Sequence, residues 1–428
     1  MAEKTLVETL NDNRIRTGAM IPLPLKFYDE AHIKALADCG VDIVIQPIDD
    51  IPEDRRKESL ELFAKYGIEG VLRTEETSKL YKGAHMFDPE KNDKMWYKDY
   101  PCFKYFMFVD EPGTTHYDEL KKSVDTFKEM YPDVRPYVNL LPMYANNAQL
   151  AGGAWQAPIE YFETADSTYK EYLDLYVEKI DTDHICVDIY PCQRIENPAC
   201  PEKFPAEYLP VSYKDYVKNI ELVADACRNS GRDFWVYIQT CSWSRWMREP
   251  NEAEIRWQAY TMLAFGAKTL LYYIMGTYSS HTGCAFDVRG DKTKTYFAIQ
   301  RMALGLHKLS DVYVQYKNLG AFNVNSTPEA TPYLEMYNPY KDFSAISDIK
   351  CDSPLLIGCF EKKEGEGKAF TLVNMQDFAS PKTVSAKLKI NGNNITVYRD
   401  GIPSKQTSSD GWYEFTLVQG DGIFVTID

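Results

Sequence analysis

Two neighbouring acids, Asp110 and Glu111, follow directly on an apolar run, residues 105–109, and are themselves followed by Pro112 and Gly113. Carboxyl groups at the end of a buried strand suit acid–base chemistry, because one can donate a proton while another stabilises developing positive charge. Proline cannot continue the strand, and a helical pattern begins soon after it. The pair is therefore a candidate catalytic site. The alternative is that both acids only stabilise the positive amino-terminal end of that helix.

Eight short apolar runs alternate with amphipathic stretches before residue 295. The runs are residues 18–24, 41–47, 68–74, 103–112, 135–142, 184–191, 233–243 and 268–278. In the stretches between them, apolar residues recur at the spacing of one buried helix face. Runs that are apolar on both faces and alternate with helices indicate a parallel sheet. Eight such units predict a (β/α)8 TIM barrel, with a doubly wound sheet as the alternative.

The pattern changes near residue 320. From there, short and partly alternating apolar runs are separated by Gly, Asn and Asp, with no helical pattern between them. This predicts a small antiparallel β-sandwich or meander. We expect residues 1–315 to form the barrel with the catalytic site, and residues 316–428 to form a β-sandwich domain that supports the barrel.

Composition excludes several classes of function. The net charge of −15 argues against nucleic acid and anionic membrane surfaces as partners. No apolar segment is long enough to span a membrane. Residues 1–18 are charged and lack the core of a signal peptide, which predicts a cytoplasmic protein, or a secreted one if a leader has been removed. The ten cysteines form no CxxC pair, and no acidic or histidine cluster has metal-ligand spacing, so we expect neither cofactor nor metal.

Polar and aromatic residues close most of the predicted strands, where a barrel carries its active site. Asn139 ends the fifth strand, and Asp188 and Tyr190 end the sixth. Gln239 and Trp243 follow the seventh, and Tyr273 ends the eighth. Asp188 is the most attractive second acid: a nucleophile, a general base or a ligand to a substrate hydroxyl, unless it only binds loop amides.

Two acids lined by aromatic and amide side chains are what hydrolysis of a glycosidic bond requires. Glu111 is the better proton donor. Successive residues of a strand point to opposite faces, so Asp110 and Glu111 cannot both face the barrel axis unless the strand has already broken. We expect Glu111 to reach the cleft with a raised pKa. Asp110 would pair with a neighbouring strand or orient a substrate group.

The remaining candidates would bind the substrate. The amides Asn139 and Gln239 can both donate to and accept from sugar hydroxyls. Tyrosine is abundant, with 31 residues, and carbohydrate clefts use aromatic rings as stacking surfaces. The candidates for binding are Asn139, Tyr144, Trp155, Tyr190, Gln239, Trp243, Tyr273 and His281. Core packing is the alternative for each aromatic residue, and a solvated loop position for His281.

The fourth strand, ending in Glu111-Pro112, resembles the Asn-Glu-Pro ending of the acid/base strand in clan A glycoside hydrolases, with Asp110 in place of asparagine. That resemblance implies a glutamate nucleophile after strand seven, where this chain has Gln239. The adjacent Asp-Glu pair is also similar to glycoside hydrolase family 123. There it would make Asp110 the residue that orients a 2-acetamido group and Glu111 the general acid. A barrel followed by a small β domain is similar to many bacterial polysaccharide-degrading enzymes.

The sequence thus predicts a glycoside hydrolase acting on an oligo- or polysaccharide, with Glu111 as the acid and Asp188 or Asp110 as its partner. One alternative is a substrate-assisted N-acetylhexosaminidase, in which Asp110 holds the acetamido group. Another is a non-catalytic carbohydrate-binding barrel that has lost its nucleophile. A lyase or isomerase for an acidic sugar would need more basic rim residues than Arg73 and Arg245.

Overall fold

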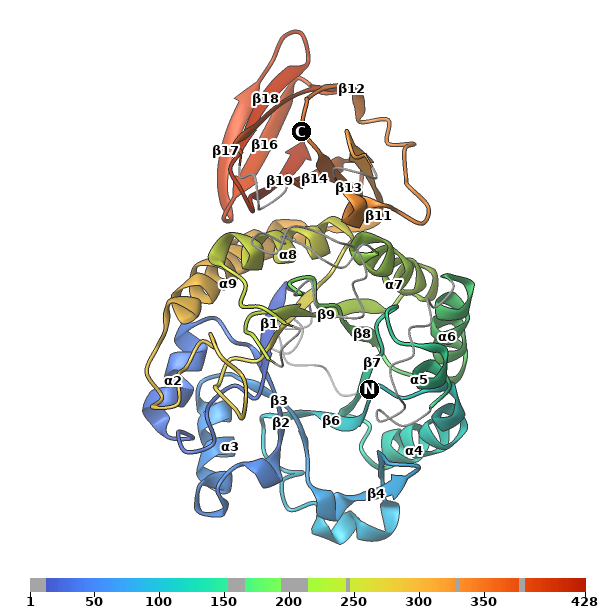
Figure 1. The fold of residues 1–428 in the computed structure, drawn as a ribbon, viewed down its shortest axis with the longest axis vertical. Helices are drawn as coiled ribbons and strands as arrows, with labels where there is room; N and C mark the ends of the chain where they lie inside the picture. The colour runs from blue at the N-terminus through green and yellow to red at the C-terminus, as the bar shows by residue number, and fades with distance from the viewer. Residues whose placement is uncertain (1–12, 153–165, 194–214, 244–246, 328–330, 377–381) are drawn as a thin grey trace.

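The predicted strands close into a barrel (Figure 1). The structure is a computed structural model that describes residues 13–152, 166–193, 215–243, 247–327, 331–376 and 382–428. The barrel order is β1-β10-β9-β8-β7-β6-β3-β2, with parallel neighbours throughout. Its strands are β1 (Arg16–Met20), β2 (Ile43–Pro47), β3 (Glu69–Arg73), β6 (Phe103–Asp110), β7 (Arg135–Leu140), β8 (His184–Asp188), β9 (Asp233–Gln239) and β10 (Thr269–Tyr273). Each apolar run overlaps one strand, and the predicted fold class is confirmed.

Helices surround the barrel (Figure 1). They are α2 (Glu30–Asp38), α3 (Arg56–Lys65), α4 (Tyr117–Met130), α5 (Asn147–Ala151), α6 (Asp166–Lys179), α7 (Tyr216–Ser230), α8 (Glu252–Ala264) and α9 (Lys294–Tyr313). One unit departs from the repeat. Between β3 and β6 the chain forms a hairpin of β4 (Ser78–Tyr81) and β5 (Ala84–Phe87) instead of an α-helix. Its turn places Lys82 and Gly83 at φ of 49° and 84°, as a tight two-residue turn requires.

The barrel interior is filled by side chains and closed at the amino-terminal end of its strands. Its buried core consists of Ile43, Ile45, Val71, Tyr105, Met107, Tyr137, Cys186, Tyr190, Trp235, Tyr237 and Leu271. Below this core, the guanidinium of Arg16 donates to Glu69 and to the Tyr105 hydroxyl, each at 2.8 Å. The packed core therefore leaves the carboxyl-terminal end of the strands as the place for a site.

Two antiparallel sheets follow the barrel. One contains β11 (Tyr316–Val324), β13 (Leu355–Lys362), β14 (Lys368–Asn374), β19 (Gly422–Ile427), β16 (Asn394–Arg399) and β17 (Ile402–Thr407). The other contains β12 (Ile346–Lys350), β15 (Val384–Ile390) and β18 (Trp412–Leu417). Side chains of both sheets share one apolar core, so the two sheets form a β-sandwich.

The sandwich lies against α8 (Figure 1). Ten of the thirteen residues of α8 are buried, because one side of the helix covers the barrel and the other meets the β13–β14–β19 sheet. Across this interface the indole nitrogen of Trp257 lies 3.2 Å from the sulfur of Met375, and Arg256 pairs with Asp421 at 3.0 Å.

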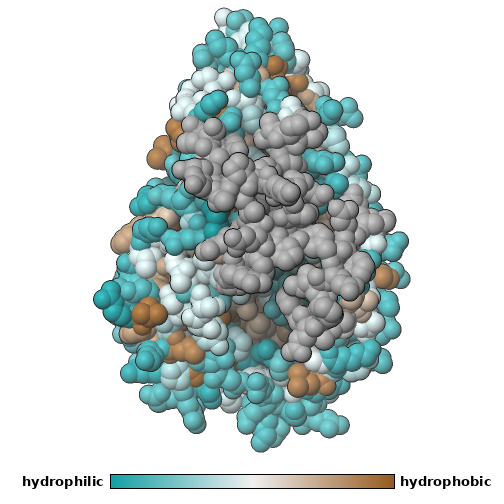
Figure 2. Space-filling view, in the orientation of Figure 1, coloured by the Kyte–Doolittle hydropathy of each residue, from teal (hydrophilic) through white to brown (hydrophobic). Residues whose placement is uncertain are grey.

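The described surface in Figure 2 is mostly hydrophilic, and its hydrophobic residues are scattered. Large exposed apolar side chains such as Leu80 in β4, Val288 in the loop before α9 and Ile402 in β17 come from separate parts of the chain. Within the described ranges, no helix has the length and apolar character needed to cross a bilayer.

Candidate active site

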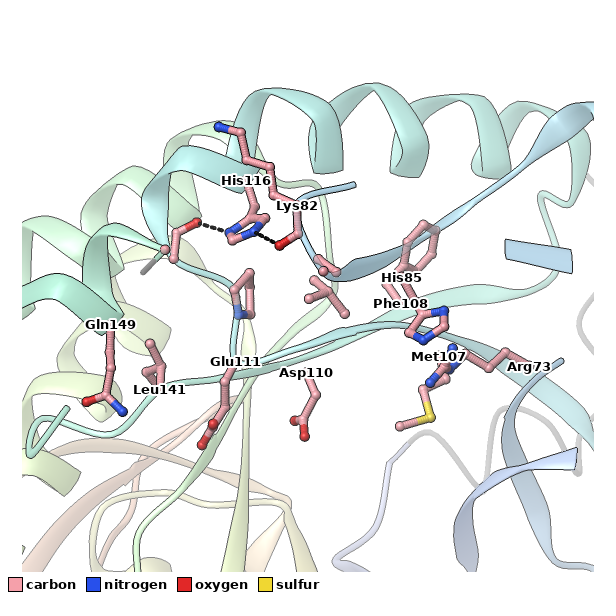
Figure 3. Close-up of a pocket in the computed structure, with 16 residues that line it drawn as sticks. Arg73, Lys82, His85, Met107, Phe108, Asp110, Glu111, His116, Leu141 and Gln149 are labelled. Atoms are coloured by element: carbon pink, nitrogen blue, oxygen red, sulfur yellow. Dashed lines mark hydrogen bonds between the residues drawn. The ribbon is translucent and has the colours of Figure 1, made fainter. Parts of the chain in front are cut away.

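The end of β6 turns both acids toward the same space. The pairing register between β6 and β7 shifts between Met107 and Asp110. Glu111 then adopts a left-handed backbone with φ of 50°, and its amide donates to the Asn139 carbonyl at 2.8 Å. A non-glycine residue in this conformation is strained, and such strain gathers at functional sites. Because the strand breaks before Glu111, the strand alternation no longer separates the pair, and both carboxyls point into one cavity (Figure 3).

Asn139 joins two of the three acids. Its amide nitrogen donates to a carboxyl oxygen of Asp110 at 3.1 Å and to one of Asp188 at 3.0 Å. The carboxyls of Asp110 and Asp188 are therefore close together, because one nitrogen atom donates to both. Asn139 is 6% exposed, and its amide oxygen has no partner among the described residues. An unpaired buried acceptor next to three acids is a position that a ligand hydroxyl would satisfy.

The carboxyls of Glu111 and Asp188 form a hydrogen-bonded pair. Burial, and then the charges of Asp188 and Asp110, raise the pKa of Glu111 well above its ordinary value. Burial and the charge of Asp110 raise the pKa of Asp188 to about 7, against the opposing effect of hydrogen bonds from Asn139 and Glu111. Burial also raises the pKa of Asp110. The interaction between the two carboxyls raises the pKa of Glu111 and lowers that of Asp188, so it favours the proton on Glu111.

The second oxygen of Glu111, Oε2, is buried and has no partner in the described chain. Its carboxyl lines a cavity of about 580 Å³ that also contains Asp110, Pro112 and Gly113. A volume of this order holds a small ligand. A protonated carboxyl with an unsatisfied atom in such a cavity is placed to meet a substrate oxygen.

Four of the predicted binding residues form an aromatic group beside the acids. The ring of Tyr190 lies 4.8 Å from that of Trp243 and 5.2 Å from that of Tyr273, and Trp243 and Tyr273 are 4.7 Å apart. His281 lies over Trp243, and its Nε2 is 3.4 Å from the Tyr273 hydroxyl. Burial lowers the pKa of His281, which favours the neutral ring. The structure therefore brings these four residues together.

The acids also raise the pKa values of two tyrosines, Tyr273 and Tyr144. The pKa of Tyr144 is raised by burial and then by the charges of Asp188 and Glu111. The pKa of Tyr273 is raised by burial, by Cys241 and then by Asp188, Asp110 and Glu111. Both hydroxyls thus remain protonated and lie in the field of the carboxyl cluster. Trp155 and Arg245 lie outside the described residues.

Gln239 does not face a substrate, contrary to the prediction. Its side chain is fully buried. Its oxygen accepts from the Cys192 amide at 2.8 Å, and its nitrogen donates to the carbonyls of Cys192 and Arg248 at 3.1 and 2.8 Å. The residue therefore fastens two loops at the barrel mouth, and no carboxylate stands at this strand end.

The β4–β5 hairpin contributes a cavity wall that the sequence analysis did not anticipate. Lys82, His85 and the strand-end residue Arg73 line the same cavity as Glu111. The carbonyl of Lys82 accepts from His116 at 3.4 Å, which connects the hairpin to the segment after β6 (Figure 3). The signal was the Lys82-Gly83 turn between two short apolar runs. Among the residues that the structure covers, no group of three or more His, Cys, Asp or Glu side chains is arranged to hold a metal.

Comparison with known proteins identifies the fold. No model of a protein family matches the sequence, and no curated protein is similar to it in sequence. Among solved structures, a GH42 β-galactosidase from G. stearothermophilus superposes with a TM-score of 0.57 at 8% identity, over 97% of this chain and 98% of that one. A family 39 glycoside hydrolase from the gut symbiont Bacteroides cellulosilyticus WH2 has a TM-score of 0.51 at 11% identity, over 98% and 82%.

An α-galactosidase I from Mortierella vinacea also superposes, with a TM-score of 0.50 at 14% identity, over 100% of this chain and 98% of that one. These neighbours are named as hydrolases of glycosidic bonds of both α and β type. At such identities the likeness concerns the barrel with its added sheet domain, and residue roles have to come from the site itself.

Proposed function

We propose that the protein hydrolyses a glycosidic bond in an oligo- or polysaccharide, with Glu111 as the general acid. The observation that carries this proposal is the buried, proton-holding Glu111 carboxyl, with its unpaired Oε2, in the cavity at the barrel mouth. A carboxylic acid with a raised pKa is what protonation of a leaving-group oxygen requires at neutral pH. The glycoside hydrolases that share the fold support the same reaction class.

Asp188 is best explained as the charge partner that keeps Glu111 protonated. Enzymes that use two carboxyl groups on either side of the sugar hold them about 5–5.5 Å apart for a nucleophile, or about 6.5–9.5 Å apart for a water-activating base. The Glu111 and Asp188 carboxyls instead lie close enough for their interaction to act on the pKa of both, as in a pair that shares one proton.

This contact favours a second, narrower candidate: substrate assistance by a 2-acetamido group, which Asp110 would orient. The Asp110 carboxyl lines the same cavity as that of Glu111 and accepts a hydrogen bond from Asn139. An internal nucleophile would also make a carboxylate at Gln239 unnecessary.

The test is turnover of aryl glycosides and oligosaccharides of both anomeric types, with and without a 2-acetamido group, by the native protein, Glu111→Gln and the exposed control Glu76→Gln. Loss of a general acid should lower turnover by about 10²–10⁴-fold, and least for aryl groups that leave without a proton. Inhibition by a thiazoline would support the acetamido route. Sugar binding without turnover by the native protein would contradict hydrolysis and favour a carbohydrate-binding barrel.

A further inference from the structure

Arg73 is a partly buried cation with two buried N–H groups that have no hydrogen-bond partner among the described residues. It is the last residue of β3, is half-buried, and lines the cavity. Its Nε and Nη1 atoms are buried, and neither has a partner within the described residues. Leaving a buried donor unpaired costs about 1–3 kcal/mol, and more when the group is charged. A ligand that supplies acceptor oxygens would remove this cost.

Two other buried or partly buried arginines among the described residues have carboxylate or hydroxyl partners, and Arg14, whose Nε is unpaired, still pairs with Asp42 through its Nη2. Arg16, at the opposite end of the barrel, donates to Glu69 and Tyr105 at 2.8 Å. Arg248 donates to Glu254 at 2.9 Å. Arg73 differs from them in position as well, because it stands in the wall of the cavity that holds Glu111. The unpaired N–H groups of Arg73 therefore lie where a bound ligand could accept hydrogen bonds from them.

Four carboxylates influence Arg73 from a distance. The charges of Glu75, Asp50, Asp110 and Asp49 oppose the lowering of its pKa by burial, and a guanidinium stays charged in any case. In the described chain none of them occupies its buried N–H groups. They also repel an incoming anion. Burial raises the pKa of Asp50 and of Asp110, so both take up a proton more readily when an anion approaches.

The hairpin places His85 on the same side of the cavity as Arg73, and burial and the charge of Arg73 lower the pKa of His85, which favours its neutral ring. His85 is half-buried, and its Nδ1 lies 3.0 Å from the Ser78 hydroxyl. Figure 3 shows Arg73 and His85 together on one side, with Asp110 and Glu111 along β6 on the other. Lys82 lies exposed at the hairpin turn. Because β3 and β6 are neighbours in the barrel, a sugar whose glycosidic oxygen meets Glu111 can present a ring substituent to Arg73.

We propose that Arg73 binds an oxyanion carried by the substrate's sugar, a carboxylate or a sulfate ester, a proposal that rests on the proposed function for its substrate. The planar fork of arginine pairs with the oxygens of carboxylates and of tetrahedral oxyanions through two parallel bonds. The cavity then has carboxyl groups that cleave and one guanidinium, that of Arg73, that selects the substrate. Hydrolysis of acidic chains, such as those containing uronic acids or sulfated sugars, would be the activity it serves.

The experiment is calorimetric titration of Glu111→Gln, in which turnover cannot interfere, with pairs of sugars that differ only in charge. Glucuronate is compared with glucose, galacturonate with galactose, and each neutral hexose with its ester sulfated at the primary hydroxyl. We expect at least one anionic sugar to bind about 10-fold or more tightly than its neutral partner at low salt. Preference for the carboxylates identifies a uronic acid, and preference for the esters identifies a sulfated sugar.

The same titrations in Arg73→Met and Arg73→Gln, each added to Glu111→Gln, should abolish the preference and leave binding of the neutral sugar unchanged. The control substitution Arg55→Met, at an exposed arginine, should keep the preference for the anionic sugar. Equal binding of charged and neutral sugars, or a preference that survives both substitutions, overturns the proposal. If the native protein hydrolyses neutral sugars while no preference is found, only this inference fails. A preference without any hydrolysis leaves it standing and removes the proposed function.

Discussion

The proton on Glu111 is retained by the burial of that carboxyl and by the negative charges of Asp188 and Asp110. The pKa of Asp188 is itself raised to about 7, so its negative charge develops as the pH passes through neutrality. Each new negative charge makes ionisation of Glu111 more costly, so its acid form persists to a pH well above the ordinary range of a glutamic acid. Activity should therefore be lost on the alkaline side, when Glu111 finally gives up its proton.

Asp188→Asn should move the alkaline limb of kcat/KM to lower pH, by about one unit or more. Asparagine keeps the shape and can still accept from Asn139, but its neutral amide no longer opposes the charge on Glu111. The check is a pH profile of kcat/KM on the best substrate found. Asp110→Asn should shift the limb in the same direction, and Asp50→Asn, whose charge does not act on Glu111, should leave it in place. Loss of turnover at every pH would instead indicate that Asp188 reacts with the sugar directly.

At the scale of elements, the segment after β6 is positioned by a contact between two glycines. A Cβ on Gly113 would lie 2.0 Å from the nitrogen and 2.3 Å from the Cα of Gly152. Gly152 ends α5 with a left-handed φ of 101°. The glycine that follows Pro112 is thus needed for close approach of the α5 end to the strand that carries the acids.

Gly113→Ala should destabilise the fold by about 1–3 kcal/mol and reduce kcat/KM by about 10²-fold, because a displacement of about 1 Å at reacting groups has that effect. The backbone of Gly113, at φ −80° and ψ 166°, is open to alanine, so only the contact is changed. Gly67→Ala is the control: its Cβ meets nothing within 4 Å, and only its φ of 70° is strained. Thermal unfolding measures the stability of the two variants, and steady-state kinetics measures their kcat/KM. Equal kinetic losses in the two variants would contradict a specific role for Gly113.

The barrel strands were predictable because their apolar character on both faces follows from helices outside and a packed core inside. The turn at Glu111 was not, since a left-handed residue next to a register shift leaves no mark in the alternation of side chains. The position of Gln239 at a strand end suits a substrate-binding residue, but its side chain binds the main chains of Cys192, 47 residues away, and Arg248, in the loop that follows its own strand. The strand pattern does not predict these contacts. The sequence placed Arg73 at the rim of the barrel, but only the folded structure shows that its buried N–H groups lack a hydrogen-bond partner among the described residues.

At the scale of the whole molecule, α8 connects the sandwich to the barrel mouth. The sequence pattern of α8 predicted one buried face, and the helix is in fact buried on both sides. On its barrel side, Gln258 bonds both backbone groups of Gln239 at 2.8 and 3.0 Å, and Glu254 pairs with Arg248. On the other side, Arg256 and Trp257 meet the sandwich. We propose that residues 316–428 support the site through this helix.

Gly358→Ala tests that support. Gly358 lies on β13, and an added Cβ would stand 2.2 Å from the carbonyl oxygen of Ala264 in α8. The helix backbone cannot yield locally, so the sandwich and the barrel should separate slightly, at a cost of about 1–3 kcal/mol. If α8 couples the two parts, the native protein unfolds in one calorimetric transition, and the variant should lose kcat although it is changed far from the acids. Gly392→Ala, whose Cβ would lie 2.6 Å from a methyl of Ile427 and 3.9 Å from the Asn394 carbonyl, strains only the sandwich itself and should leave kcat unchanged. A destabilised variant with native kcat would show that the sandwich stabilises the chain without acting on the site.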